Sequence, residues 1–241
     1  MTSHVDEKTP PRMIGRRAVA RGAAWSVPVV ALAVAAPAVA ASTNCTMGTL
    51  SWDTFRNGVT GLGTFATTIP GLTVTIAVSG DTAAADNARV TNVATGGLSQ
   101  VLRFYDQEKK NGTSQTVSIT FSKAVRNVQF SLLDVDSALA TDRRGNITDN
   151  YYQDQVQIVT PTSWSGTTHS NIVGTGTAAS PYKAKNTNSP IDGSDAASNV
   201  DLVFPGGTAG LTQVQFKYSQ GAAVDGGPFI GMSDLLFQYC A

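Results

Sequence analysis

Histidine and cysteine are scarce in this chain of 241 residues, which contains two of each. After the first forty or so residues, only His169 remains, in the polar stretch SGTTHSN. A zinc site needs several histidine or cysteine ligands, and a common type of serine hydrolase needs a G-x-S-x-G motif. That motif surrounds no serine here, so the sequence supports neither class of enzyme.

Glutamate is nearly missing from the same region, where Glu108 is the only one. No window there repeats apolar residues every 3.6 positions, so helices are not expected. The glycine-rich stretch PGGTAG, residues 205–210, lacks the lysine and the following helix of a phosphate-binding loop. We therefore predict a protein that is not an enzyme. An extracellular hydrolase that acts through aspartates remains as an alternative, because paired carboxylates are available.

A concentrated patch of basic residues is also missing. The chain has 17 basic and 17 acidic residues, and five of the basic ones but only two of the acidic ones lie in the first 41 positions. The rest of the chain is therefore mildly acidic. Proteins that bind nucleic acids neutralise phosphates with clustered lysine and arginine. Nucleic acid is therefore not an expected partner.

Residues 1–41 have the pattern of a signal peptide. Four arginines, including the pair Arg16-Arg17, precede an apolar run from about Ala23 to Ala36, and an A-x-A cleavage site follows at residues 38–40. The run is short and interrupted by prolines, so we expect no transmembrane segment in the mature form. The arginine pair indicates twin-arginine export.

The stretch GAAWSVPVVALAVAAPAVAAS resembles the leaders of secreted and surface proteins of high-GC Gram-positive bacteria. This resemblance covers the leader only, so it implies where the protein is exported and implies no activity. We expect residues 42–241 to form the mature protein, secreted or non-covalently associated with the cell surface. Its length of about 200 residues suits one β-sandwich domain.

The only two cysteines, Cys45 and Cys240, lie near the two ends of the mature region. In an exported protein such a pair is typical of a disulfide. This pairing would make the first and last strands neighbours. The chain-entropy model gives it a stabilisation of at most roughly 5 kcal/mol. Two free thiols are the alternative.

Alternation of apolar and polar residues with a period of two recurs throughout the mature region. Short strands with one apolar face each form two packed antiparallel sheets. We therefore predict an all-β, two-sheet antiparallel β-sandwich of the jelly-roll type. The stretch FSKAV, residues 121–125, is interpreted as the turn of a hairpin. The clearest strands are expected at residues 72–78, 116–121, 128–136, 154–159, 200–204, 212–219 and 234–240.

Three aspartates continue the core-facing rows of two of these strands. Side chains in a strand alternate between its faces, so Asp134 and Asp136 share a face with Leu132. Asp154 shares a face with Val156 in the next strong strand. Because the intervening loop returns the chain, we expect the three carboxylates to converge at one rim of the core.

Carboxylates that lie this close repel one another unless something neutralises them. Structural Ca²⁺, which prefers six to eight oxygen ligands, is the expected cofactor, with Asp134, Asp136 and Asp154 as its candidate ligands. A bridging arginine is a second solution, and a bulge that turns the aspartates outward is a third. The further candidates are Asp142, Asn146 and Asp149 as ligands and Arg103, Arg126, Arg143 and Arg144 as bridges.

Aromatic residues in or beside the predicted loops are candidates for ligand contacts. Trp164 lies in the otherwise polar stretch SWSG, and Tyr151 and Tyr152 precede a predicted strand. Tyr182 and Trp52 are similarly placed. Aromatic rings on a rim stack against sugars, and binding residues concentrate in loops. Ordinary packing at a sheet edge is the alternative for each ring.

The segments ITFSKAVRNVQFSLLDVD and YQDQVQIV resemble jelly-roll modules of extracellular carbohydrate-binding and adhesin proteins. The resemblance covers a small part of the chain and implies that strand-end aspartates hold a structural Ca²⁺. We therefore predict a secreted, non-catalytic binding or adhesion module that recognises a glycan, matrix or surface protein through loop aromatics. A structural protein of the cell envelope without a small ligand is the alternative.

Overall fold

The computed structural model describes residues 44–82, 86–106, 113–141, 147–186, 190, 192–221 and 228–241. Residues 44–241 form one compact unit. The predicted signal peptide, residues 1–41, lies outside the described residues, so export by this leader stays a prediction. Within the described part of the chain, no helix is long and apolar enough to cross a membrane.

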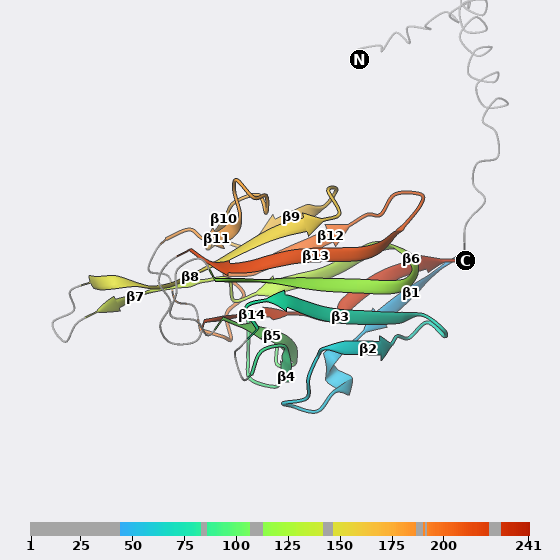
Figure 1. The fold of residues 1–241 in the computed structure, drawn as a ribbon, viewed down its shortest axis with the longest axis horizontal. Helices are drawn as coiled ribbons and strands as arrows, with labels where there is room; N and C mark the ends of the chain where they lie inside the picture. Colours follow the sequence, from blue (N-terminus) through green and yellow to red (C-terminus); the bar gives the residue numbers. More distant parts are fainter. Residues whose placement is uncertain are drawn as a thin grey trace, which may run out of the picture. The chain divides into compact units, whose positions relative to one another are not determined.

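The fold is all-β, as the alternating pattern predicts, and every strand pairing is antiparallel (Figure 1). The described residues contain one 3₁₀ turn, η1 (Trp52–Thr54), and no α-helix. The strands are β1 (Cys45–Leu50), β2 (Gly63–Ala66), β3 (Thr73–Gly80), β4 (Arg89–Thr91), β5 (Val101–Tyr105), β6 (Ser114–Leu133), β7 (Ser137–Thr141), β8 (Ile147–Thr160), β9 (Ser165–Thr168), β10 (Ile172–Val173), β11 (Tyr182–Ala184), β12 (Val200–Phe204), β13 (Leu211–Gln220), β14 (Phe229–Met232) and β15 (Leu235–Cys240).

Strand β6 organises the fold because it pairs along its length with two different sets of strands. Its first part pairs with β3 and β13, and its second part with β12, β14 and β15. The hairpin predicted at residues 121–125 is therefore wrong, since the chain runs on without reversing. Residues 122–124 are exposed, and Asn127 has a positive φ of 48°, as at a bulge where a strand changes from one set of partners to another.

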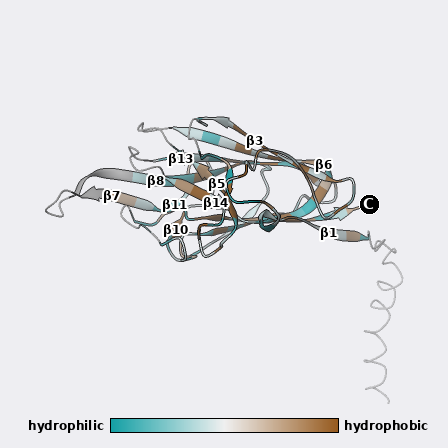
Figure 2. Ribbon diagram, turned by 90° about the horizontal axis from the view of Figure 1, so that it is seen from below, coloured by the Kyte–Doolittle hydropathy of each residue, from teal (hydrophilic) through white to brown (hydrophobic). Residues whose placement is uncertain are grey.

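Because both sets share β6, the strands make one connected and curled antiparallel sheet. Side chains from the two sets still meet across the core: the rings of Phe104 in β5 and Phe216 in β13 have centroids 5.7 Å apart. Phe121 and Phe237 likewise meet at 5.2 Å. Hydrophobic segments recur along the strands in Figure 2. This packing is consistent with the predicted sandwich, while the jelly-roll order of strands stays a prediction.

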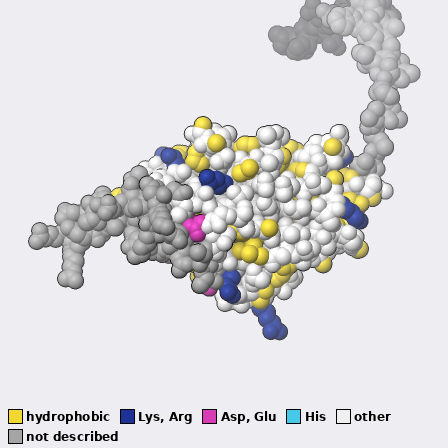
Figure 3. Space-filling model, in the orientation of Figure 1, with side chains coloured by type: hydrophobic (Ala, Val, Ile, Leu, Met, Phe, Trp, Pro, Cys, Tyr) yellow, Lys and Arg dark blue, Asp and Glu magenta, His cyan; other side chains and the backbone are white. Residues whose placement is uncertain are grey.

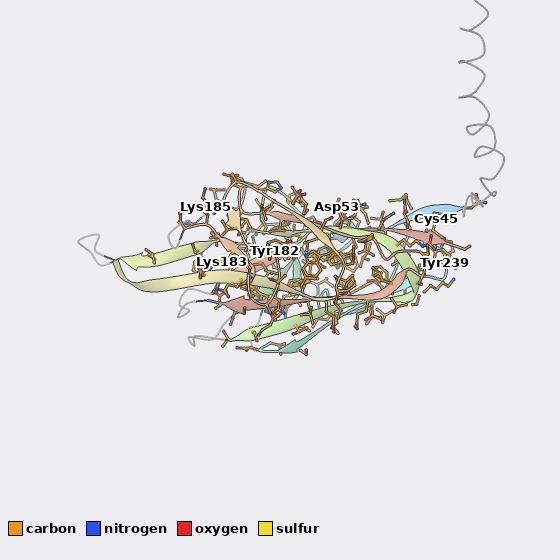
Figure 4. The ribbon with its side chains drawn as sticks, turned by 90° about the horizontal axis from the view of Figure 1, so that it is seen from above. Cys45, Asp53, Tyr182, Lys183, Lys185 and Tyr239 are labelled. Atoms are coloured by element: carbon orange, nitrogen blue, oxygen red, sulfur yellow. A yellow bond between two sulfur atoms is a disulfide. The ribbon has the colours of Figure 1, made fainter. Side chains whose placement is uncertain are left out.

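The predicted disulfide is present. Cys45 in β1 lies directly opposite Cys240 in β15, and their sulfur atoms are 2.02 Å apart. Figure 4 shows Cys45 and Tyr239 together at one end of the sheet. The first and last strands are therefore neighbours, as the pairing of the two cysteines predicts, and the bond closes a sequence separation of 195 residues.

Candidate functional site

Asp134, Asp136 and Asp154 are all buried, and the charge of Asp136 acts on both of the others, so we call the three the aspartate cluster. Asp154 is fully buried in β8, and the other two are only about 5 to 6% exposed in the connection between β6 and β7. The backbone N–H of Asp154 donates to the carbonyl of Asp136 at 3.0 Å, and the N–H of Asp136 donates to Oδ2 of Asp154 at 3.3 Å.

The backbone at Asp134 differs from the predicted regular strand. Strand β6 ends at Leu133, and Asp134 has a left-handed backbone with φ of 61°. Aspartate tolerates this conformation better than most residues. The regular strand predicted through Asp136 is thus wrong, and Val135 enters the core with no exposed surface. The carboxylates are nevertheless buried and do not turn outward.

Asp154 is satisfied by hydrogen-bond donors. The Tyr218 hydroxyl and the Gln220 side-chain amide each donate to Oδ1 of Asp154 at 2.7 Å. Burial, together with the negative charge of Asp136, raises the pKa of Asp154 well above its ordinary value, and these donors oppose the rise. Sequence reasoning missed Tyr218 and Gln220, although their even numbering in β13 places both on one face.

Tyr152 contacts the aspartate cluster. It is half-buried and hydrogen-bonded to Asp136, and burial, reinforced by that charge, raises the pKa of Tyr152 far above its ordinary value. Its hydroxyl therefore bonds to Asp136, and a contact of its ring with a ligand stays a prediction. The side chain of Tyr151, the other predicted tyrosine, lies outside the described part of the structure, as do the side chains of Asp142, Asn146 and Asp149.

Asp134 is the least satisfied member of the aspartate cluster. Its Oδ1 is buried without a hydrogen-bond partner in the described structure. Burial is the main cause that raises the pKa of Asp134 to about 7, and the charges of Asp136 and Asp192 add to it while Arg103 opposes it. Of the arginines that were predicted to bridge the aspartates, Arg103 acts on Asp134 through its charge and forms no hydrogen bond to it in the described structure. Arg126 donates to the carbonyl of Thr208, and Arg143 and Arg144 lie outside the described residues.

No group of three or more histidine, cysteine, aspartate or glutamate side chains is arranged to hold a metal ion in the described ranges. Oxygens of Asp154 already accept three hydrogen bonds. The unpartnered Oδ1 of Asp134, in contrast, is the kind of hard, buried oxygen that a cation satisfies. Calcium binding to Asp134, Asp136 and Asp154 stays a proposal, which depends chiefly on Asp134.

A cavity of about 330 Å³ lies near β9 and β11, and we call it the aromatic cavity. The indole of Trp164 is half-buried against the core, whereas Tyr182 is only 2% exposed. All the described residues that line the aromatic cavity are uncharged. They are Thr162, Trp164, Gly166, Thr168, Gly174, Thr175 and Tyr182.

Glycine at two positions makes room for the Tyr182 ring. A Cβ atom at Gly166 would lie 2.0 Å from the Tyr182 hydroxyl oxygen, and one at Gly176 would lie 2.4 Å from its ring. Trp164 and Tyr182 also show no hydrogen bond from the indole N–H or the phenol to another described residue. The half-buried indole of Trp164 is thus available to a ligand, whereas Tyr182 belongs to the core and is only 2% exposed. The sequence named both residues as aromatic candidates, and long-range pairing of β11 with β8 brings Tyr182 to the cavity.

His169 forms a different arrangement from that of a catalytic triad. Its Nε2 lies 3.0 Å from Oδ2 of Asp201, and the Ser131 hydroxyl donates to the other oxygen of Asp201 at 2.5 Å. The carboxylate therefore stands between serine and histidine. In a triad the histidine stands between the other two, since it must accept the serine proton.

The basic side chains on the face shown in Figure 3 are scattered over several elements and do not gather in one patch. No protein-family model, no curated protein and no solved structure matches this chain.

Proposed function

We propose that this chain is a secreted, non-catalytic binding module that recognises a neutral glycan in the aromatic cavity. The observation that carries the proposal is the half-buried indole of Trp164 together with three threonines in a lining without charge. Aromatic faces bind the apolar side of a sugar ring, and hydroxyl and indole N–H groups bond its hydroxyls. An uncharged lining favours a ligand without charge, because buried charges need partners.

The disulfide supports the proposed location outside the cytoplasm, since such bonds persist in oxidising compartments. The alternative, a structural protein of the cell envelope, predicts the same fold and the same disulfide. The two proposals differ in the aromatic cavity, which binds no ligand if the protein is purely structural. A glycan array with the purified protein separates the two, because only a recognition module retains particular neutral polysaccharides.

Trp164→Ala is expected to weaken glycan binding by roughly tenfold or more, as for an aromatic residue at the centre of a binding site. Thr168→Val, which removes one cavity hydroxyl and keeps the side-chain shape, is expected to weaken it by a smaller factor. Affinity is measured by calorimetry with the best glycan from the array. Leu236→Ala is the control, because this exposed residue of β15 lies outside the aromatic cavity. Unchanged affinity in both cavity variants would contradict the proposal.

Calcium is expected to stabilise the protein if the aspartate cluster holds it. Saturation at 100 times the dissociation constant stabilises a folded protein by about 2.7 kcal/mol. We expect the melting temperature at pH 7.5 to rise with millimolar Ca²⁺ relative to EDTA, and Asp134→Asn to abolish the rise. The control is Asp53→Asn, which changes an exposed aspartate outside the cluster. Equal melting temperatures with Ca²⁺ and with EDTA would remove calcium from the proposal.

A further inference from the structure

Strand β9 is an edge strand, because its only strand partner in the described structure is β12. In an antiparallel ladder, residues whose backbone N–H and C=O groups bond to the partner strand alternate with residues whose groups point away from it. The N–H of His169 donates to the Asn199 carbonyl at 3.0 Å, which extends the register of β9 against β12. The odd-numbered residues of β9 are therefore the bonded ones, and the backbone groups of Gly166 and Thr168 point away from β12.

The ladder on the other side of β12 leads to the same assignment. The N–H of Ser233 donates to the Ser131 carbonyl at 3.0 Å, so the backbone groups of the odd-numbered residues in this part of β6 point away from β12. The even-numbered residues of β6 therefore bond to the even-numbered residues of β12. The alternate residues of β12, Asp201 and Val203, are left to bond to β9, opposite its odd-numbered residues.

Both outward-pointing residues of β9 line the aromatic cavity. Gly166 and Thr168 are exposed, and their backbone groups form no hydrogen bond to a described residue outside β12. Gly174, which directly follows β10, also lines the cavity, and its N–H and C=O have no hydrogen-bond partner among the described residues. The aromatic cavity thus combines unpartnered backbone donors and acceptors from two chain segments with the indole of Trp164.

The inner face of β9 is open beside the cavity. Gly166 lies opposite Leu202 of β12, whose side chain is buried in the core. Directly opposed residues project from the same face, so Gly166 and Thr168 face inward although both are exposed. Glycine at position 166 has no side chain to cover the backbone, which lets a ligand group approach the edge of the strand closely.

We propose that the glycan bound in the aromatic cavity is an N-acetylated sugar, an inference that rests on the proposed function. A trans secondary amide presents its C=O and its N–H in opposite directions, so one acetamido group can bond to two chain segments at once. Its carbonyl accepts from the N–H of Thr168, and its N–H donates to the carbonyl of Gly174. Its methyl group packs against the indole of Trp164. A hydroxyl in place of the acetamido group is shorter and makes fewer of these contacts.

An extended peptide offers the same amide chemistry, and exposed strand edges accept such peptides in many proteins. Strand β9 has only four residues, however, and only two of them point outward, so a peptide would gain few backbone hydrogen bonds there. The half-buried indole of Trp164 and the threonine hydroxyls of the lining suit the two sides of a sugar ring. The observations therefore favour the sugar.

The test is a calorimetric titration of the full chain with triacetylchitotriose, cellotriose and acetyl-tetraalanine amide. The two trisaccharides are neutral and differ only in the acetamido groups, which replace hydroxyls. We expect triacetylchitotriose to bind about tenfold more tightly than cellotriose, as the additional hydrogen bonds imply, and the peptide to bind more weakly than both.

Equal affinity for the two trisaccharides would overturn the N-acetyl inference and leave a neutral glycan as the ligand. The inference also fails if neither trisaccharide binds at millimolar concentrations while the glycan array retains other neutral polysaccharides. An array without any retained polysaccharide would overturn the proposed function as well. Binding of the peptide as tight as that of triacetylchitotriose would assign the edge of β9 to a peptide strand.

Thr168→Pro tests the backbone contact, because proline removes the N–H that points away from β12. Proline is tolerated on an edge strand where the lost N–H faces solvent, so the fold is expected to persist, which the melting temperature checks. Thr168→Val is the matched control, since it also loses the hydroxyl but keeps the N–H. We expect Thr168→Pro to bind triacetylchitotriose about tenfold more weakly than Thr168→Val does. Equal affinity of the two folded variants would overturn the contact, and if Thr168→Pro does not fold, the comparison of the two trisaccharides decides the inference.

Discussion

Removal of the disulfide by Cys45→Ser with Cys240→Ser is expected to lower the free energy of unfolding by several kcal/mol, up to about 5 kcal/mol. The bond spans a sequence separation of 195 residues, so its loss greatly enlarges the conformational freedom of the unfolded chain. It also frees β1, whose only strand partner in the described structure is β15. Urea denaturation followed by the fluorescence of Trp52, which is fully buried, measures the loss.

Reduction of the wild-type protein with a thiol provides the control for this experiment. It is expected to reproduce the stability of the double serine variant and to leave that variant unchanged. A loss below about 1 kcal/mol would show that the paired strands hold the two ends of the domain without the covalent bond. The chain-entropy argument would then fail for this fold.

Stability is expected to fall as the pH rises from about 4 to about 7, because of Asp134. Its pKa is raised from 3.8 in the unfolded chain to about 7 in the folded protein, so the folded state binds more protons over this interval. The free energy of unfolding therefore decreases with rising pH and levels off above pH 7. A difference of about three pKa units corresponds to roughly 4 kcal/mol. Asp154, whose pKa is also raised, contributes with the same sign.

Asp134→Asn is expected to be more stable than the wild type at pH 8 and nearly equal to it at pH 4, because the amide has the shape of the carboxylic acid and no charge. Denaturation midpoints are measured between pH 4 and pH 8 in EDTA, which keeps cations away from the aspartate cluster. Asp53→Asn, the exposed control, is expected to keep the wild-type dependence on pH. A variant Asp134→Asn that is destabilised equally at both pH values would contradict the assignment.

The candidate sites were predicted from the sequence only in part. The even spacing of Asp154 and Val156 placed Asp154 correctly on the core face, and the polar surroundings of Trp164 pointed to the aromatic cavity. The left-handed backbone of Asp134 was not predicted, because aspartate occurs in this conformation without requiring it.

The all-β class and the face on which most strand residues lie follow from the amino-acid sequence alone, because a period of two assigns faces without any knowledge of the neighbouring strand. The disulfide follows as well, because two cysteines allow only one pairing. That β6 runs through residues 121–125 as one strand depends on its distant partners and is visible only in the folded protein. Exposed residues such as 122–124 can have the same composition in a hairpin turn as in a continuous strand. Hydrogen bonds to distant strands decide which of the two forms, and the local sequence does not contain them.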